Sequence, residues 1–342
     1  MEKIEKLASD IIIKGYIISR NEAEGIFEAD FAKLLENAGR ICRHFKSNEA
    51  KLCSIINAKS GACPEDCKFC AQSVFSKSNI EKYPLRGIEQ IEKSYLSAIN
   101  NGASCFGIVT SGRSLSRSEL DKVCSAARKL KGREIPVSVS VGELDETSLE
   151  KLKKSGIKRI HHNIESSESF FPSICTTHTF LDKVKSIKKA KQLGFEVCSG
   201  VLFGLGESFN QRVEAAFSLR ELGVDSVPMN FFNPVPGTAL YGIRPLSEEE
   251  ILRTIAMFRF VLPDKDIRVC GGRETNLKEA QHKIFSAGAN GMMIGGYLTT
   301  AGRPVAEDLK MIKEIGFKSY RYPTAAAACP PEAEVWRLDD GR

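Results

Sequence analysis

The chain has 342 residues, and the 42% that are apolar suffice for one large α/β barrel or for two ordinary domains. Its 49 Lys and Arg exceed its 43 Asp and Glu by a net charge of +6, and the densest basic run, residues 183–191, has the spacing of a solvated helix, so we expect no nucleic-acid partner. No run approaches the ~20 apolar residues that cross a bilayer, and the acidic start shows no signal-peptide pattern. We therefore predict a cytoplasmic protein with no membrane contact.

The order of apolar and charged segments predicts the fold. Residues 1–46 are predicted to form a helical N-terminal extension. Between residues 47 and 318, apolar runs alternate with amphipathic segments of helical length. The runs predict eight strands, at residues 52–58, 105–110, 135–141, 157–164, 195–203, 224–231, 266–270 and 290–294. This pattern predicts a parallel (β/α)8 TIM-type barrel, with a doubly wound open sheet as the alternative. Residues 319–342 are assigned to a C-terminal tail, either disordered or of foreign origin.

Local signals at the helix ends support this division. A three-residue offset between Ser or Thr and Glu or Gln predicts capping boxes at four helix starts: Ser116 with Glu119, Thr147 with Glu150, Ser208 with Gln211, and Ser247 with Glu250. Glycines that follow helical patterns predict left-handed C-caps at Gly102, Gly132, Gly156, Gly194, Gly223, Gly288 and Gly316.

Three cysteines stand close together after the first predicted strand, at Cys63, Cys67 and Cys70. Three thiolates on one loop can hold three irons of a cubane cluster and leave the fourth iron open to a substrate or cofactor. A structural zinc site would need a further pair of Cys or His ligands nearby, and a disulfide would need an oxidising compartment. The spacing therefore predicts an iron–sulfur site, with zinc as the less favoured interpretation.

Polar residues recur with period two inside the predicted apolar strands. Alternate strand residues face the inside of a barrel, and catalytic groups gather at the C-terminal ends of the strands. So many inward polar side chains predict a shared ligand. The residues concerned are Cys53, Asn57, Cys105, Ser138, Ser140, His161, Asn163, Glu165, Cys198, Asn230, Arg268 and Cys270.

From about residue 20 to about residue 318, the chain resembles the biotin synthases, a family of the radical S-adenosylmethionine (SAM) superfamily. The superfamily as a whole shares the cysteine loop with its aromatic residue Phe69. The more discriminating motifs are residues 162–165 (HNIE), 197–200 (VCSG) leading to 204–207 (GLGE), 226–230 (SVPMN) and 272–274 (GRE). The resemblance implies a (β/α)8 barrel with a 4Fe-4S cluster and SAM at its mouth, dethiobiotin in the middle and an auxiliary iron–sulfur cluster deeper in. It also implies a homodimer and a flavodoxin or ferredoxin-type reductant.

The reaction implied by the resemblance is sulfur insertion into dethiobiotin, which yields biotin. Reductive cleavage of SAM would supply a 5′-deoxyadenosyl radical, and the auxiliary cluster would supply the sulfur. Two other functions stay open. The chain could be a related radical SAM enzyme, such as a hydrogenase-cofactor maturase or a pyrrolysine-pathway mutase, or a non-enzymatic iron–sulfur or sulfur-carrier protein.

The resemblance also implies roles for single residues. Cys63, Cys67 and Cys70 would be the catalytic residues that hold the SAM cluster. The cofactor-binding residues would be Phe69, Asn163, Glu165 and Lys183, and the substrate-binding residues Asn230, His161 and Asn163. Three of these positions depart from the family pattern: Glu165 replaces Asp, Lys183 replaces Arg, and His161 replaces Asn.

The auxiliary site departs most from the family pattern, which uses three cysteines and one arginine. Cys105, Cys198 and Arg268 match that pattern, but Ser138 stands at the third cysteine position. A serine hydroxyl is a poor ligand for a soft metal. Two additional inward cysteines, Cys53 and Cys270, therefore predict an altered cluster, more consistent with four irons than with two.

The ligands expected for this altered cluster are Cys198 and Cys270, with Cys53 and Cys105 as the remaining candidates and Arg268 as a ligand or a neighbour. Loss of the auxiliary cluster is the alternative. The remaining cysteines are interpreted as structural or as part of the tail: Cys42, Cys124, Cys175 and Cys329.

Overall fold

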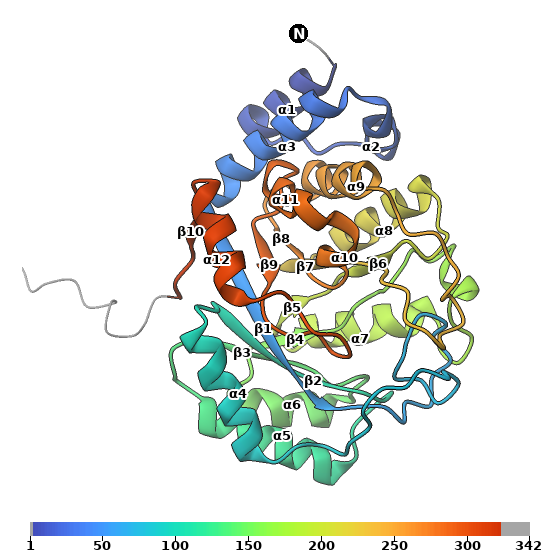
Figure 1. Ribbon diagram of the computed structural model, residues 1–342, viewed down its shortest axis with the longest axis vertical. Helices are drawn as coiled ribbons and strands as arrows, with labels where there is room; N and C mark the ends of the chain where they lie inside the picture. Colours follow the sequence, from blue (N-terminus) through green and yellow to red (C-terminus); the bar gives the residue numbers. More distant parts are fainter. Residues whose placement is uncertain (1–2, 323–342) are drawn as a thin grey trace, which may run out of the picture.

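The computed structural model describes residues 3–322 (Figure 1). Most of the predicted tail, including Cys329, lies outside the described residues. The strands are β1 (Glu49–Lys59), β2 (Cys105–Thr110), β3 (Val137–Ser140), β4 (Arg159–His161), β5 (Glu196–Cys198), β6 (Val201–Phe203), β7 (Ser226–Phe231), β8 (Asp266–Val269), β9 (Gly291–Met293) and β10 (Lys318–Ser319).

The helices alternate with the strands and surround them. They are α1 (Lys3–Lys14), α2 (Arg20–Gly25), α3 (Phe31–Lys46), α4 (Ile88–Asn100), α5 (Arg117–Leu130), α6 (Glu146–Lys154), α7 (Phe180–Gln192), α8 (Phe209–Glu221), α9 (Glu248–Val261), α10 (Arg273–Leu277), α11 (Lys283–Ser286) and α12 (Val305–Glu314). Short 3-10 turns occur at Ile26–Glu28, Phe171–Ser173 and Lys278–His282. Among the described residues, no helix combines the length and apolar character needed to span a bilayer.

The sheet closes into a barrel. Neighbouring strands pair in parallel from β1 through β5 to β7, β8 and β9, and β1 also pairs with β9. This closure confirms the predicted (β/α)8 barrel and excludes the open doubly wound sheet. All eight predicted strands are present. The pairing of Glu49 with Lys318 adds β10 beyond them, at the edge of β1.

The strands separate two environments, as the period-two pattern predicted. On β2, Phe106 and Ile108 are fully buried on the side that faces the helices, and Phe106 makes an edge-to-face contact with Tyr95 of α4 at 5.6 Å. The alternate residues Cys105 and Val109 face the interior cavity. Packing in the outer layer therefore holds β2 in the register that turns Cys105 inward.

The predicted strand 195–203 is interrupted at Ser199 and Gly200, and so forms β5 and β6. A Cβ atom at Gly200 would lie 1.8 Å from the carbonyl oxygen of Pro228 on β7, so only glycine allows this close approach. The break brings β6 alongside the second half of β7, where Val201 pairs with Met229.

Most of the predicted helix ends are confirmed. Reciprocal capping boxes begin α5 at Ser116, α8 at Ser208 and α9 at Ser247. All seven predicted C-cap glycines have positive φ angles, between 59° and 99°. The predicted start at Thr147 is wrong, because the Asp145 side chain accepts a 2.8 Å hydrogen bond from the Ser148 backbone N–H and begins α6 earlier.

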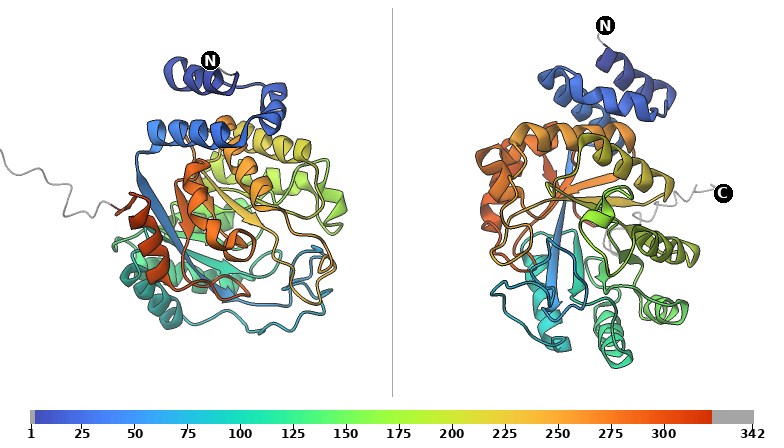
Figure 2. Two further views of the ribbon diagram at one scale, coloured as in Figure 1. Left: turned by 45° about the horizontal axis from the view of Figure 1, so that its top comes forward. Right: turned by 90° about the vertical axis from the view of Figure 1, so that its right-hand side faces the viewer.

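Helices α1 to α3 lie together at the end of the barrel where β1 begins (Figure 2). Arg253 of α9 donates a 2.8 Å hydrogen bond to the carbonyl oxygen of Ala29, which precedes α3. Arg220 of α8 donates a 2.9 Å bond to that of Ile18. These contacts connect the N-terminal helices to the outer helical layer, away from the loops that follow the strands.

Candidate active site

A cavity of about 450 Å³ occupies the inside of the barrel. Its lining includes the loops that follow β1, β2, β3, β7 and β9, so its mouth lies at the C-terminal ends of the strands, where TIM-barrel sites are found. Most of the predicted site residues line it: Phe69, Cys70, Cys53, Cys105, His161, Asn163, Glu165, Lys183, Cys198, Asn230, Arg268 and Cys270. Cys63 and Cys67 are half-buried in the same loop as Cys70.

The floor of the cavity carries four buried thiols and one guanidinium. Parallel pairing sets Cys53 of β1 beside Cys105 of β2, with their sulfur atoms 2.7 Å apart. Arg268 Nη1 donates to Cys53 Sγ at 3.0 Å and lies 3.8 Å from Cys105 Sγ. Cys198 of β5 and Cys270, just after β8, complete the group. We call these five residues the floor cluster.

The charges of the floor cluster are distributed unevenly. A hydrogen bond between Cys53 and Cys105 lowers the pKa of Cys105 and raises that of Cys53 well above its ordinary value. Burial raises the pKa of Cys198, but His161 lowers it more, to about 7. The Nδ1 atom of His161 lies 3.4 Å from Cys198 Sγ. Burial raises the pKa of Cys270 to about 12. Cys105 and Cys198 are thus the two thiols of the floor cluster whose pKa values are lowered, and Arg268 contributes to both shifts.

This donor set fits an iron–sulfur cluster. Thiolates are the soft ligands that such clusters need, and the cysteines come from four separate strand positions around one floor. Buried Arg268 Nε has no hydrogen-bond partner among the described residues. The hydroxyl of Ser138 points to the strand backbone instead and donates to the Phe106 carbonyl oxygen at 3.3 Å. The cysteine thiols suit a soft metal better than the Ser138 hydroxyl, which also lines the cavity.

Nearer the mouth, Asn163 and Glu165 follow β4. Asn163 Oδ1 accepts a 3.0 Å hydrogen bond from the Gly200 backbone N–H, and its Nδ2 lies 3.5 Å from Glu165 Oε2. Glu165 has a left-handed φ of 65°, an uncommon angle for a residue other than glycine, and Leu202 holds it by a 2.7 Å backbone bond. Burial raises the pKa of Glu165, although Lys183 opposes this. The Glu165 carboxyl group therefore faces the cavity, where it could accept hydrogen bonds from the hydroxyl groups of a ligand.

Asn230 and His161, the two predicted substrate-binding residues deeper in the barrel, have different partners. The Asn230 amide is largely engaged with the backbone, because Nδ2 donates to the Val201 carbonyl oxygen at 3.1 Å and Oδ1 accepts from the Gly271 N–H at 2.9 Å. One amide hydrogen remains for a ligand. His161 contacts Cys198 and so belongs beside the floor cluster, deeper than the sequence pattern indicated.

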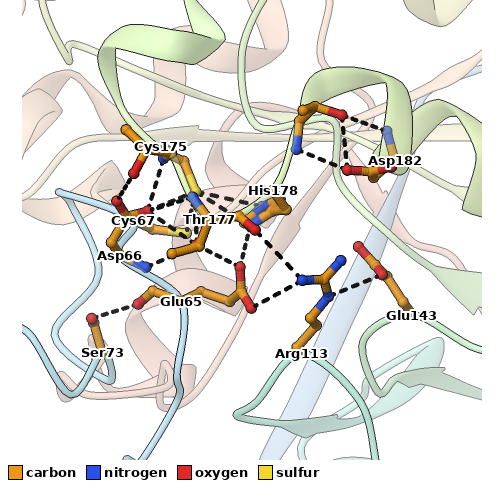
Figure 3. Close-up of polar contacts among 12 residues, drawn as sticks. Glu65, Asp66, Cys67, Ser73, Arg113, Glu143, Cys175, Thr177, His178 and Asp182 are labelled. Carbon is orange, nitrogen blue, oxygen red and sulfur yellow. Dashed lines mark hydrogen bonds and ion pairs between the residues drawn. The ribbon is translucent and has the colours of Figure 1, made fainter.

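The cysteine loop is anchored by backbone and side-chain contacts. Cys63 N–H donates to the Gln72 carbonyl oxygen at 3.1 Å, and Cys70 N–H donates to that of Cys67 at 2.9 Å. In Figure 3, the neighbouring Glu65 and Asp66 face the segment that contains Cys175 and His178. Burial raises the pKa of Cys70 to about 11, a cost that a bound cation offsets. The loop thus fits a metal cluster.

Comparison with known proteins identifies the family. The chain is 48% identical over 323 residues to the biotin synthase of Citrifermentans bemidjiense, covering 92% of this chain and 98% of that protein. It is 47% identical over 307 residues to the biotin synthase of Endomicrobium trichonymphae, covering 90% and 96%. The chain belongs to the biotin synthase family. Two family models match parts of it: the radical SAM superfamily at residues 58–219 and the biotin and thiamin synthesis associated domain at 228–318.

Solved structures show the same fold at much lower identity. Methylornithine synthase superposes with a TM-score of 0.77 at 19% identity, over 92% of this chain and 97% of that one. The FeFe-hydrogenase maturase from Carboxydothermus hydrogenoformans gives 0.77 at 17%, over 92% and 78%. These likenesses confirm the barrel, whereas identity of about half the residues to the biotin synthases separates this chain from the other radical SAM functions left open above. It is a radical SAM enzyme of biotin synthesis.

Within this biotin synthase fold, the sequence pattern missed three residues near the predicted sites. Arg159 lines the cavity and stands two residues before His161 on β4, so the period-two rule could have found it. Cys175 and His178 lie against the cysteine loop. The hydrogen bond that Cys67 donates to Cys175 lowers the pKa of Cys175 and raises that of Cys67. No local signal indicates this contact, because 108 residues separate the two thiols.

Proposed function

We propose that this enzyme converts dethiobiotin to biotin with sulfur from an auxiliary cluster held by the floor cluster. The observation that carries the proposal is the presence of four buried cysteines and Arg268 at the floor of the same cavity whose mouth contains Cys70. A substrate bound between them would have a radical source on one side and a sulfur source on the other. The names of the relatives at 47–48% identity support dethiobiotin and SAM as the reactants.

At the mouth, Cys63, Cys67 and Cys70 would hold the 4Fe-4S cluster. When bound and reduced, that cluster supplies a 5′-deoxyadenosyl radical from SAM, which can remove hydrogen from carbons that no side-chain base could deprotonate. The proposed work of the chain is to position the reactants and exclude water. Glu165 and Asn163 would orient SAM, with Lys183 as a single positive charge near its carboxylate and Phe69 packing beside it.

At the floor, Cys53, Cys105, Cys198 and Cys270 would hold a four-iron auxiliary cluster. Arg268 would compensate its negative charge, since Nη1 already lies within reach of two of the sulfur atoms. His161 would stay beside Cys198, and Asn230 would offer its remaining amide hydrogen to the substrate. A cytoplasmic homodimer reduced by flavodoxin or a ferredoxin completes the proposal.

The test is an anaerobic assay of the reconstituted enzyme with dethiobiotin, SAM and reductant. We expect biotin, 5′-deoxyadenosine and about eight irons per chain, the content of two cubanes. Cys270→Ser should remove biotin formation while 5′-deoxyadenosine is still made. Cys124→Ser, which changes a buried cysteine of α5 away from the cavity, is the matched control. About six irons, or normal biotin formation by Cys270→Ser, would show that the auxiliary cluster is an ordinary two-iron one.

A further inference from the structure

Three metal-binding side chains meet beside the cysteine loop, outside the barrel cavity. The ligand atoms of Cys67, Cys175 and His178 all lie within 4.8 Å of one another (Figure 3). Cys67 belongs to the loop after β1, and the other two residues belong to the segment between the Phe171–Ser173 turn and α7. Their sulfur atoms are 3.8 Å apart. A tetrahedral ion with metal–sulfur bonds of about 2.3 Å places its two sulfurs about 3.8 Å apart, so this spacing fits a shared ion.

The His178 ring contacts both the Glu65 carboxylate and the Cys175 thiol. Its Nδ1 lies 2.5 Å from Glu65 Oε2, and Arg113 Nη1 lies 3.9 Å from the other oxygen of that carboxylate. The same Nδ1 lies 3.2 Å from Cys175 Sγ, whereas Nε2 lies 3.8 Å from it, so Nδ1 is the ring nitrogen that faces this thiol. An ion held by the three side chains would replace the proton that Nδ1 shares with Glu65, and the Glu65 carboxylate would balance part of its charge.

The neighbouring carboxylate does not complete the site. Asp66 Oδ1 lies 3.1 Å from Cys175 Sγ, but it accepts hydrogen bonds from the backbone N–H groups of Thr176 at 2.9 Å and Thr177 at 3.1 Å. These bonds hold the 174–178 segment against the loop. The arrangement therefore offers three protein ligands and leaves a fourth position for water, with Cys175 and His178 both buried.

We propose that the chain, when it lacks its SAM cluster, binds one thiophilic divalent ion such as Zn²⁺ at Cys67, Cys175 and His178. Each thiol releases a proton on ligation, and no electron is transferred. Because Cys67 is also a proposed cluster ligand, the ion and the cluster exclude each other. Only this exclusion rests on the proposed function; the binding of the ion does not.

The binding test uses the full-length cluster-free protein under anaerobic conditions. Thiols are alkylated with and without one equivalent of Zn²⁺, and each cysteine is quantified by peptide mass spectrometry. We expect Zn²⁺ to protect Cys67 and Cys175 together while Cys63 and Cys70 keep their reactivity. Glu65→Gln should weaken zinc binding by about 10- to 100-fold, because the negative charge of the carboxylate beside Nδ1 is lost. His282→Ala, an exposed histidine, is the control.

A second measurement follows the visible absorbance of the cluster during reconstitution with iron and sulfide. Zn²⁺ should delay cluster formation in the native chain but not in Cys175→Ser, whose folding is checked by circular dichroism. Protection of Cys63, Cys67 and Cys70 with Cys175 still reactive would place the ion on the loop alone and overturn the proposal, as would protection that Cys175→Ser leaves unchanged. A chain that made no biotin would still show the zinc protection. Failure of the proposed function can therefore be distinguished from failure of the zinc proposal.

Discussion

At the scale of single residues, burial and hydrogen bonding give chemically identical thiols different properties. His161 helps to lower the pKa of Cys198 to about 7, whereas burial raises that of Cys270 to about 12 although Arg268 opposes this rise. Cluster binding would remove this difference, because a coordinating thiol is deprotonated by the metal itself. Two predictions concern single residues at the mouth.

The first concerns the cysteine loop. Cys67→Ala should abolish 5′-deoxyadenosine production, because the cluster would lose one of its three protein ligands. The measurement is product analysis after anaerobic reconstitution, with SAM and dithionite present. Cys42→Ser, a change in a buried cysteine of α3, should leave production near the native rate. Native rates in Cys67→Ala would disprove the proposed cluster assignment.

The second concerns Glu165 at the cavity mouth. Glu165→Gln keeps the side-chain shape but removes the charge and replaces one acceptor oxygen with an NH2 donor, so it should weaken SAM binding by roughly 1.5–3 kcal/mol, the value of one charge-assisted hydrogen bond. Calorimetric titration with SAM measures this, and Glu168→Gln on the exposed surface is the control. Dethiobiotin affinity without SAM should not change. A loss confined to dethiobiotin would assign Glu165 to the other ligand.

At the scale of elements, a helix begins at the residue whose side chain accepts hydrogen bonds from the free backbone N–H groups of the first turn. At α6, Asp145 does so two residues before Thr147, although Thr147 has the better sequence match to a capping box. The competition is local, yet the chain path that leads out of β3 decides it. A short aspartate in extended conformation fits that path.

The contributions of Asp145 and Thr147 to the start of α6 can be compared by measuring protein stability. Asp145→Ala should lower the free energy of unfolding by about 1 kcal/mol, the usual value of an N-cap, whereas Thr147→Ala, inside the first turn of α6, should change it by less than about 0.5 kcal/mol. Urea unfolding of the cluster-free proteins compares the two. If Thr147→Ala proved the more damaging change, α6 would begin where the sequence motif indicates.

At the scale of the whole molecule, Arg273 connects the end of β8 to α12. Its guanidinium is fully buried, and Nη2 lies 3.0 Å from Oδ2 of Asp308, which is buried as well. The residue-272–274 motif therefore has a structural role in addition to its value as a family marker. The buried pair holds α12 against the start of α10.

Breaking the ion pair between Arg273 and Asp308 should destabilise the fold. Asp308→Ala should lower the free energy of unfolding by roughly 1.5–3 kcal/mol, because Arg273 loses its buried partner and keeps only the more exposed Glu274 as a counter-charge. Glu307→Ala removes a neighbouring exposed carboxylate that pairs with Arg303, and should cost less than about 1 kcal/mol. Thermal unfolding followed by circular dichroism compares the two variants. Similar stability losses would mean that the burial of Asp308 contributes little.

The sequence by itself determined the order of the elements, the inward direction of strand residues such as Cys105 and Cys198, and the composition of the cysteine loop. Each of these depends on short-range physics: side chains alternate along strands, glycines adopt left-handed angles at helix ends, and three thiolates lie within eight residues. Their agreement along the chain was enough to predict a barrel whose inner wall carries cysteine thiols.

Only the tertiary structure decided which of these groups touch. Barrel closure and register set Cys53 against Cys105, and the approach of Pro228 divided the predicted strand at Gly200. The contact of Cys67 with Cys175 depends on the path of an irregular segment, for which no periodicity exists. Contacts between residues far apart in sequence arise from the packing of whole elements, so no local pattern specifies them.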